Sequence, residues 1–310
     1  MGSFSELPPI HYLIHNGDVG VNMFFILSGY LVFKGFQHQD PLTFIVMKAI
    51  RVFPLMWLIV TSMYFLSITN FANISQISFL DYLHAVTLTF PVNPLDTFLP
   101  PLWTLVYQIK FYAGVSVMLL IFLKLKSKKM ALLIFIFLYS CVNYFTPNYS
   151  LYNWGLDING NFFAIGVLLS ILRFSKTTNE KFIATMLIVI TWLNVFAASQ
   201  YDTIYMSILL LSCFVVLLKF DFVSNKKFLL VLRKLDGITY SVFLIHFPYM
   251  LWALRKLSIT DINQELIYVL VLISTLLLSF CVYQAYDLPV SKHLKKAWEN
   301  YREKLWSSEE

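Results

Sequence analysis

The chain has 310 residues, of which 58% are hydrophobic and only 13% charged, and its formal net charge is +6. Soluble globular domains carry about 25% charged residues, so this composition excludes a soluble enzyme and indicates a polytopic membrane protein. The three cysteines, Cys141, Cys213 and Cys281, all fall in apolar segments. They are expected to be small buried side chains, with neither a disulfide nor a metal site.

Apolar segments along the chain predict membrane-spanning helices, since a bilayer core needs about 20 mostly apolar residues, and the shorter segments fit the interior of a bundle. These segments cover residues 20–36, 52–69, 101–123, 130–146, 160–174, 182–198, 204–219, 238–254 and 265–285. Residues 70–100 are too polar to span and predict a loop with an interfacial amphipathic turn near residues 79–89. The predicted fold class is therefore an all-α polytopic membrane bundle with about nine transmembrane helices.

Basic residues set the orientation, since Lys and Arg accumulate on the cytoplasmic side of a membrane. Apart from Lys110, Arg255 and Lys256, every Lys and Arg falls within alternate connections, at residues 34–51, 124–129, 173–181, 219–234 and 292–304. We place these connections inside, so that a C-terminal tail, residues 291–310, is cytoplasmic. The positive charge is then an orientation signal with some attraction to anionic membrane lipid, and it requires no nucleic acid.

The same topology gives an extracytoplasmic N-terminal segment, residues 1–19, ahead of an integral membrane domain, residues 20–290. The first span then runs from outside to inside, although residues 1–19 contain no Lys or Arg. One more helix before residue 1 would place both ends of the chain inside. The charge pattern therefore leads us to expect that a first helix is missing.

Residues 20–30, GVNMFFILSGY, place a Ser-Gly pair inside the first span. Small side chains let another backbone or a ligand approach closely at Ser28 and Gly29, and ordinary helix packing is the alternative. Residues 48–57, KAIRVFPLMW, carry Lys48 and Arg51 before the second span, with Pro54 suited to the first turn of a helix. These cations either anchor the helix at the cytoplasmic side or hold phosphates, which Arg binds bidentately.

Residues 101–112 begin PLWTL and continue to Gln108, Lys110 and Phe111-Tyr112. The Trp fits an interfacial aromatic belt. Gln108 cannot act as a general base, but it can hydrogen-bond a hydroxyl or a carbonyl. Lys110 lies within the span, where an ionisable residue is a functional candidate, unless it extends to the outer surface.

Residues 161–166, NFFAIG, form a weak motif that helix packing alone could explain. Residues 237–248, GITYSVFLIHFP, place His246 in mid-span. Imidazole can orient or deprotonate a hydroxyl near neutral pH. The surrounding string favours a polar His246 that lines a site, and a structural His with satisfied hydrogen bonds is the alternative. Residues 286–289, YDLP, close the last span, and Asp287 would cap or brace its cytoplasmic end.

Taken together and in this order, the six motifs resemble those of the membrane acyltransferase-3 family, O-acyltransferases of bacterial surface glycans. The resemblance covers residues 20–289, although Gln108 stands where the family often has Glu and Asp287 where it has Glu. It implies a multi-pass protein of the bacterial inner membrane that moves an acyl group, most often acetyl, from cytoplasmic acyl-CoA to a sugar hydroxyl. The acceptor would be a surface polysaccharide or its lipid-linked precursor, and no cofactor would be permanently bound.

We take His246, Gln108, Lys110 and Ser28 as the candidate catalytic residues, and Arg51 with Lys48 as the candidates for binding the acyl-CoA donor. Family members usually begin with a helix that bears an Arg and a catalytic His. This chain has no Arg before Arg51, and Pro8-Pro9 interrupts any helix leading to His11 and His15.

Two alternatives to an active O-acyltransferase therefore stay open. One is a catalytically inactive remnant that keeps the fold. The other is a polytopic transporter, which the near absence of Asp and Glu from the predicted spans disfavours.

Overall fold

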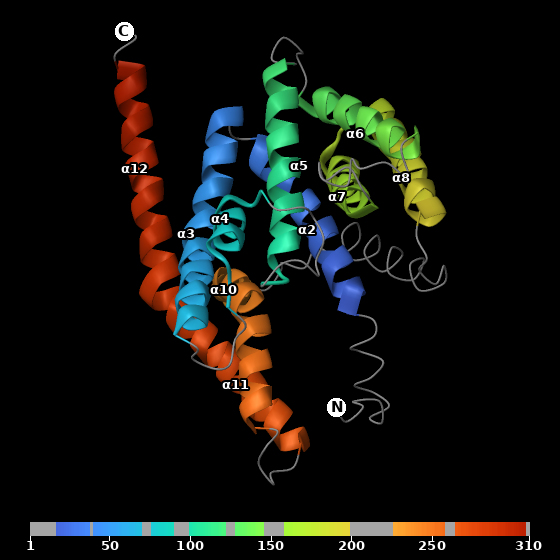
Figure 1. Ribbon diagram of the computed structural model, residues 1–310. Coiled ribbons are helices and arrows are strands. Elements are labelled where there is room, and N and C mark those ends of the chain that lie inside the picture. The colour runs from blue at the N-terminus through green and yellow to red at the C-terminus, as the bar shows by residue number, and fades with distance from the viewer. Residues whose placement is uncertain are drawn as a thin grey trace. The chain divides into compact units, whose positions relative to one another are not determined.

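The computed structural model describes residues 17–37, 40–69, 76–89, 99–121, 128–145, 158–198, 226–257 and 264–307. Every element assigned within these ranges is helical (Figure 1). The elements are α2 (Gly17–Gln37), α3 (Pro41–Ile68), α4 (Phe79–Thr87), α5 (Leu102–Ile121), α6 (Lys128–Phe145), α7 (Ile158–Phe174), α8 (Thr178–Ala198), α10 (Lys226–Leu257), α11 (Gln264–Val282), the π-helical turn η4 (Tyr283–Asp287) and α12 (Leu288–Ser307). The predicted span at residues 204–219 and most of the N-terminal segment lie outside the described residues.

The described helices agree with the predicted all-α membrane fold. Four are long and apolar enough to cross a membrane on length and composition: Pro41–Ile68, Leu102–Ile121, Gly237–Leu254 and Glu265–Lys304. Two apolar helices are shorter, at Gly20–Phe33 and Gly160–Phe174. Helices α6 and α8 form where spans were predicted but are not among these four, and each begins with a polar, charged first turn.

The chain divides into two compact units, each described by itself. The first comprises Met1–Ile45 and Tyr107–Asp221, and the second Val46–Val106 and Phe222–Glu310. Cys141 and Cys281 are both free cysteines. The expectation that Cys281 is buried was wrong, because this side chain lies on the exposed face of the apolar helix α11.

In the first unit, α2 packs closely against α7. A Cβ atom at Gly29 of α2 would overlap the backbone carbonyl of Phe163, and one at Gly166 of α7 would overlap that of Ile26. Phe163 also stacks on Phe111 of α5, with ring centroids 4.8 Å apart. The Ser-Gly and NFFAIG motifs are therefore the two sides of one helix crossing, as the packing interpretation of each motif predicted.

Helix α3 begins earlier than predicted. The expectation that Pro54 occupies the first turn of this helix was wrong, because the helix starts at Pro41 and Pro54 lies inside it. The backbone N–H of Thr43 donates to Asp40 Oδ1 at 2.8 Å, so Asp40 caps the helix and Pro41 takes the first helical position. Arg51 consequently lies in the interior of a 28-residue helix, about three turns from its start.

The last span also differs from the expectation, because the helix does not close at residues 286–289. Helix α11 passes through the π-turn η4 directly into α12, which continues to Ser307 (Figure 1). Pro289 lacks a backbone N–H, and the π-turn ends two residues before it. Helix α4 forms where the interfacial turn was expected, and its N-cap Ser78 accepts a hydrogen bond from the backbone N–H of Asp81.

Candidate functional site

Arg51 of α3 is held by a buried carboxylate in the second unit. Its Nη1 lies 3.6 Å from Oδ2 of Asp287 in the turn η4. The Asp287 side chain is 1% exposed, whereas 35% of the Arg51 side chain is exposed. Asp287 also accepts a hydrogen bond from Ser291 Oγ at 3.3 Å. The arrangement anchors one side of the guanidinium while leaving part of it accessible.

Helix α10 contributes a third residue to the surroundings of Arg51, Tyr240. Its buried hydroxyl donates to the backbone carbonyl of Val52 at 2.7 Å. The Arg51 Cζ atom lies 5.6 Å from the centroid of the Tyr240 ring, within the range of a cation–π contact. Tyr286 OH donates to the carbonyl of Pro54 at 3.4 Å. Arg51 is thus fixed by side chains from α10 and η4 as well as by its own helix.

Lys48 precedes Arg51 by three residues on α3, so the two cations are neighbours on one helix surface. Both side chains are partly exposed. A planar guanidinium beside an ammonium group suits a phosphate-bearing ligand, because Arg binds phosphate oxygens bidentately and Lys adds a second positive charge.

His246 lies on α10 and is half-buried. Its Nδ1 is 2.7 Å from the carbonyl oxygen of Phe243 and 3.1 Å from that of Val242. Since a carbonyl only accepts, we assign the proton of the neutral ring to Nδ1. This tautomer leaves the lone pair on Nε2, and the ring can therefore accept a proton there.

Ser28 and Gln108 meet in the first unit, together with Tyr112. The Gln108 amide donates to Tyr112 OH at 2.6 Å and approaches Ser28 Oγ at 3.5 Å. All three side chains are buried. Lys110 is partly buried on α5 and, two residues beyond Gln108, lies on a different face of that helix.

The predicted site residues therefore fall into two groups. Ser28, Gln108 and Lys110 belong to the first unit, and Lys48, Arg51 and His246 to the second. Among the described residues, no group of three or more His, Cys, Asp or Glu side chains could hold a metal ion.

Sequence reasoning did not single out Tyr112 and Tyr240 as site residues. Tyr112 bonds to a residue one turn away, but Tyr240 bonds to a backbone carbonyl 188 positions earlier in the chain. The available signal was the phenol itself, because a Tyr hydroxyl inside an apolar segment has to find a partner.

These motifs and the helical fold were compared with known proteins. A family model described as an acyltransferase domain, acyltransferase 3, matches residues 3–284. The chain belongs to the acyltransferase-3 family. The protein is accordingly a membrane acyltransferase enzyme, as its motifs predicted. Comparisons with curated proteins and with solved structures found no match.

Proposed function

We propose that this acyltransferase-3 family member transfers an acyl group, in the first instance acetyl, from cytoplasmic acyl-CoA to a sugar hydroxyl. The acceptor is a surface polysaccharide or its lipid-linked precursor, and the enzyme is a multi-pass protein of the bacterial inner membrane with a cytoplasmic C-terminus. The family match supports acyl transfer. We propose the acyl-CoA donor, the glycan acceptor and the roles of the individual residues that follow.

The observation that carries the proposal is the restrained, partly exposed Arg51. A long Arg side chain loses conformational entropy when it binds a ligand. The Asp287 carboxylate and the Tyr240 ring have already ordered this one. A pre-ordered guanidinium with Lys48 one turn away matches the phosphates of a CoA thioester, and it defines the donor side of the reaction.

His246 supplies the acid–base chemistry in this proposal. Nε2 accepts the proton of the sugar hydroxyl as its oxygen attacks the thioester carbonyl, and the CoA thiolate leaves. Bonds from Nδ1 to the carbonyls of Val242 and Phe243 hold the ring in the required tautomer. We assign Gln108 and Ser28 to a second polar locus in the first unit, with Lys110 as a further cation on α5.

Replacing Arg51 tests donor binding. We expect Arg51→Ala to raise the KM for acyl-CoA about 10- to 100-fold, the equivalent of about one hydrogen bond to a charged group. Arg51→Lys should recover part of this loss, because an ammonium group keeps the charge but not the bidentate geometry. Acyl-CoA consumption and glycan O-acyl content, measured with membranes containing each variant, give the two readouts.

Two controls separate binding from folding. Arg51→Ala leaves the buried Asp287 carboxylate without its ion-pair partner, which is costly. The double variant Arg51→Ala/Asp287→Asn removes that charge and should fold while still binding acyl-CoA weakly. Arg302→Ala on α12 makes the same charge change elsewhere and should not alter KM. An unchanged KM in the folded double variant would contradict the proposal, and a folded wild-type chain without any acyl transfer would favour the inactive remnant.

A further inference from the structure

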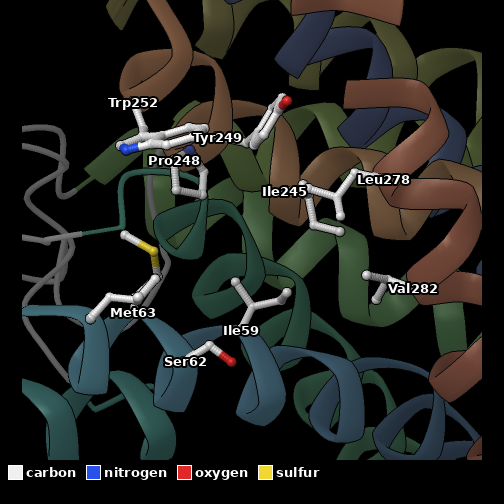
Figure 2. Close-up of a pocket in the computed structure, with 10 residues that line it drawn as sticks. Ile59, Ser62, Met63, Ile245, Pro248, Tyr249, Trp252, Leu278 and Val282 are labelled. Carbon is white, nitrogen blue, oxygen red and sulfur yellow. The ribbon is translucent and has the colours of Figure 1, made fainter. Parts of the chain in front are cut away.

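A cavity of about 260 Å³ opens in the second unit where α3, α10 and α11 meet (Figure 2). Figure 2 shows the side chains that line the cavity: from α3 Ile59, Ser62 and Met63, from α10 Ile245, Pro248, Tyr249 and Trp252, and from α11 Leu278 and Val282. The single hydroxyl group of the α3 lining, on Ser62, already donates to the carbonyl of Leu58 at 2.7 Å. The walls are otherwise almost entirely apolar.

The three helices that form the cavity all contain candidate membrane spans. Hydrocarbon replaces water around such helices, and an apolar cavity binds apolar ligands while remaining dry. The chemistry of the walls therefore selects a flexible hydrocarbon chain over a sugar or a nucleotide.

Trp252, at one end of this cavity, supplies a polar contact. Its indole Nε1 is buried and has no hydrogen-bond partner among the described residues. A buried donor without a partner is costly, and a Trp N–H in an apolar site normally meets an acceptor. A carbonyl oxygen at the end of the hydrocarbon chain would satisfy it once the indole turns toward the cavity, because the Nε1 atom itself has almost no accessible surface.

A second cavity, of about 330 Å³, shares Tyr249 and Trp252 with the first and adds Lys256 to the lining. Ile245, Tyr249, Trp252 and Lys256 follow one face of α10 at helical spacing, over about 16 Å. Along this face the side chains change from apolar groups to an indole with a buried N–H donor and then to an exposed cation. The order matches a glycerophospholipid, which carries an acyl chain, an ester carbonyl and a phosphate.

We propose that this face of α10 binds a membrane glycerophospholipid. One acyl chain fills the cavity between α3, α10 and α11, its ester carbonyl accepts a hydrogen bond from Trp252 Nε1, and its phosphate pairs with Lys256. Neither Arg51 nor His246 lines either cavity, and lipid binding there does not depend on acyl transfer.

Photo-crosslinking in lipid nanodiscs tests the site with the full chain. The probe is a diester glycerophospholipid that carries a diazirine in one acyl chain, and mass spectrometry maps the adducts. We expect adducts on the cavity-lining parts of α3, α10 and α11, and about fivefold less labelling in Leu278→Trp, which fills the cavity. The matched control is Leu277→Trp, a neighbour on α11 that does not line the cavity and is 61% exposed, and its labelling should be unchanged.

Two further variants test the polar contacts. Trp252→Phe keeps an aromatic ring but removes the donor, so it should abolish a preference of about threefold for the diester probe over its diether analogue. Trp298→Phe on α12 makes the same change outside the cavity and should keep the preference. Lys256→Gln should lower labelling about threefold, and less at high salt.

Several results would overturn the proposal. Labelling spread evenly over the lipid-exposed helices, or reduced equally by Leu277→Trp and Leu278→Trp, would show that no site exists. Displacement of the probe by a polyprenyl phosphate or a long-chain acyl-CoA, but not by excess phospholipid, would assign the cavity to a different lipid. If Leu278→Trp does not fold, the diester and diether comparison in Trp252→Phe decides by itself.

Discussion

Gly29 and Gly166 are the residues that allow α2 and α7 to approach so closely. A methyl group at either position would overlap a backbone carbonyl of the other helix, which cannot move aside as a flexible side chain can. By contrast, a Cβ atom at Gly20, also on α2, would have no neighbour within 4 Å. Replacing Gly with Ala should therefore destabilise the fold at Gly29 and Gly166 and stabilise it at Gly20.

We expect Gly29→Ala and Gly166→Ala each to destabilise the fold by about 1–3 kcal/mol through overpacking. Gly20→Ala should stabilise it by about 0.5–1 kcal/mol, because Ala is the better helix former. Thermal unfolding of the purified variants in detergent measures all three. Equal stability of Gly20→Ala and Gly166→Ala would contradict the close crossing.

Sequence alone indicated that the Ser-Gly pair permits a close approach, but it could not show which backbone approaches. Ser28 and Gln108 were both identified as candidates. They are 80 positions apart in the chain, so no local pattern shows that they are in contact. The ion pair of Arg51 with Asp287 could not be predicted from the sequence for the same reason. A local pattern shows that a polar side chain needs a partner, whereas the identity of that partner depends on how the helices pack.

At the scale of elements, α6 and α8 are joined by polar contacts. Lys129 Nζ donates to Glu180 Oε2 at 3.1 Å, at the start of both helices. Further along, Asn194 Nδ2 donates to the carbonyl of Ser140 at 3.0 Å, and the hydroxyls of Ser140 and Thr191 lie 3.2 Å apart. The ion pair is the one contact of this set that responds to pH.

Burial would raise the pKa of Glu180, but hydrogen bonds and the positive charge of Lys129 outweigh it and leave this pKa below its ordinary value of 4.5. The pair therefore contributes its full stability above pH 4.5 and loses it as the pH falls through the lowered pKa. We expect the wild type to lose up to about 1 kcal/mol more than Glu180→Gln between pH 6 and pH 3, as is usual for a partly exposed pair. Parallel pH dependence of the two unfolding temperatures would argue against the pair.

Helix positions were predicted better than helix ends. Hydrophobic runs located the apolar part of α3, but its true start depends on the Asp40 cap and on Pro41, which lie ahead of that run. Pro54 seemed to mark a beginning because its ring disfavours a helix interior. The packing of α10 and η4 against this stretch of α3 offsets that preference.

For the whole molecule, the distribution of Lys and Arg predicts that the C-terminus is cytoplasmic. A C-terminal green fluorescent protein fusion should then fluoresce, and a C-terminal alkaline phosphatase fusion should be inactive, when each is expressed in bacteria. Phosphatase activity without fluorescence would reverse the predicted orientation. The same result would also place Arg51 on the side without acyl-CoA.

The five residues of η4 also affect the direction in which Asp287 points. A π-turn accommodates one residue more than an α-helical path, and each residue turns a helix by about 100°. The direction in which Asp287 points therefore depends on how many residues precede it in α11, as well as on its identity. A three-base deletion in this stretch of the gene would leave Arg51 and Asp287 unchanged and still separate them. The ion pair therefore depends on the number of residues in this stretch as well as on their identity. A sequence alignment that scores substitutions alone would miss its loss.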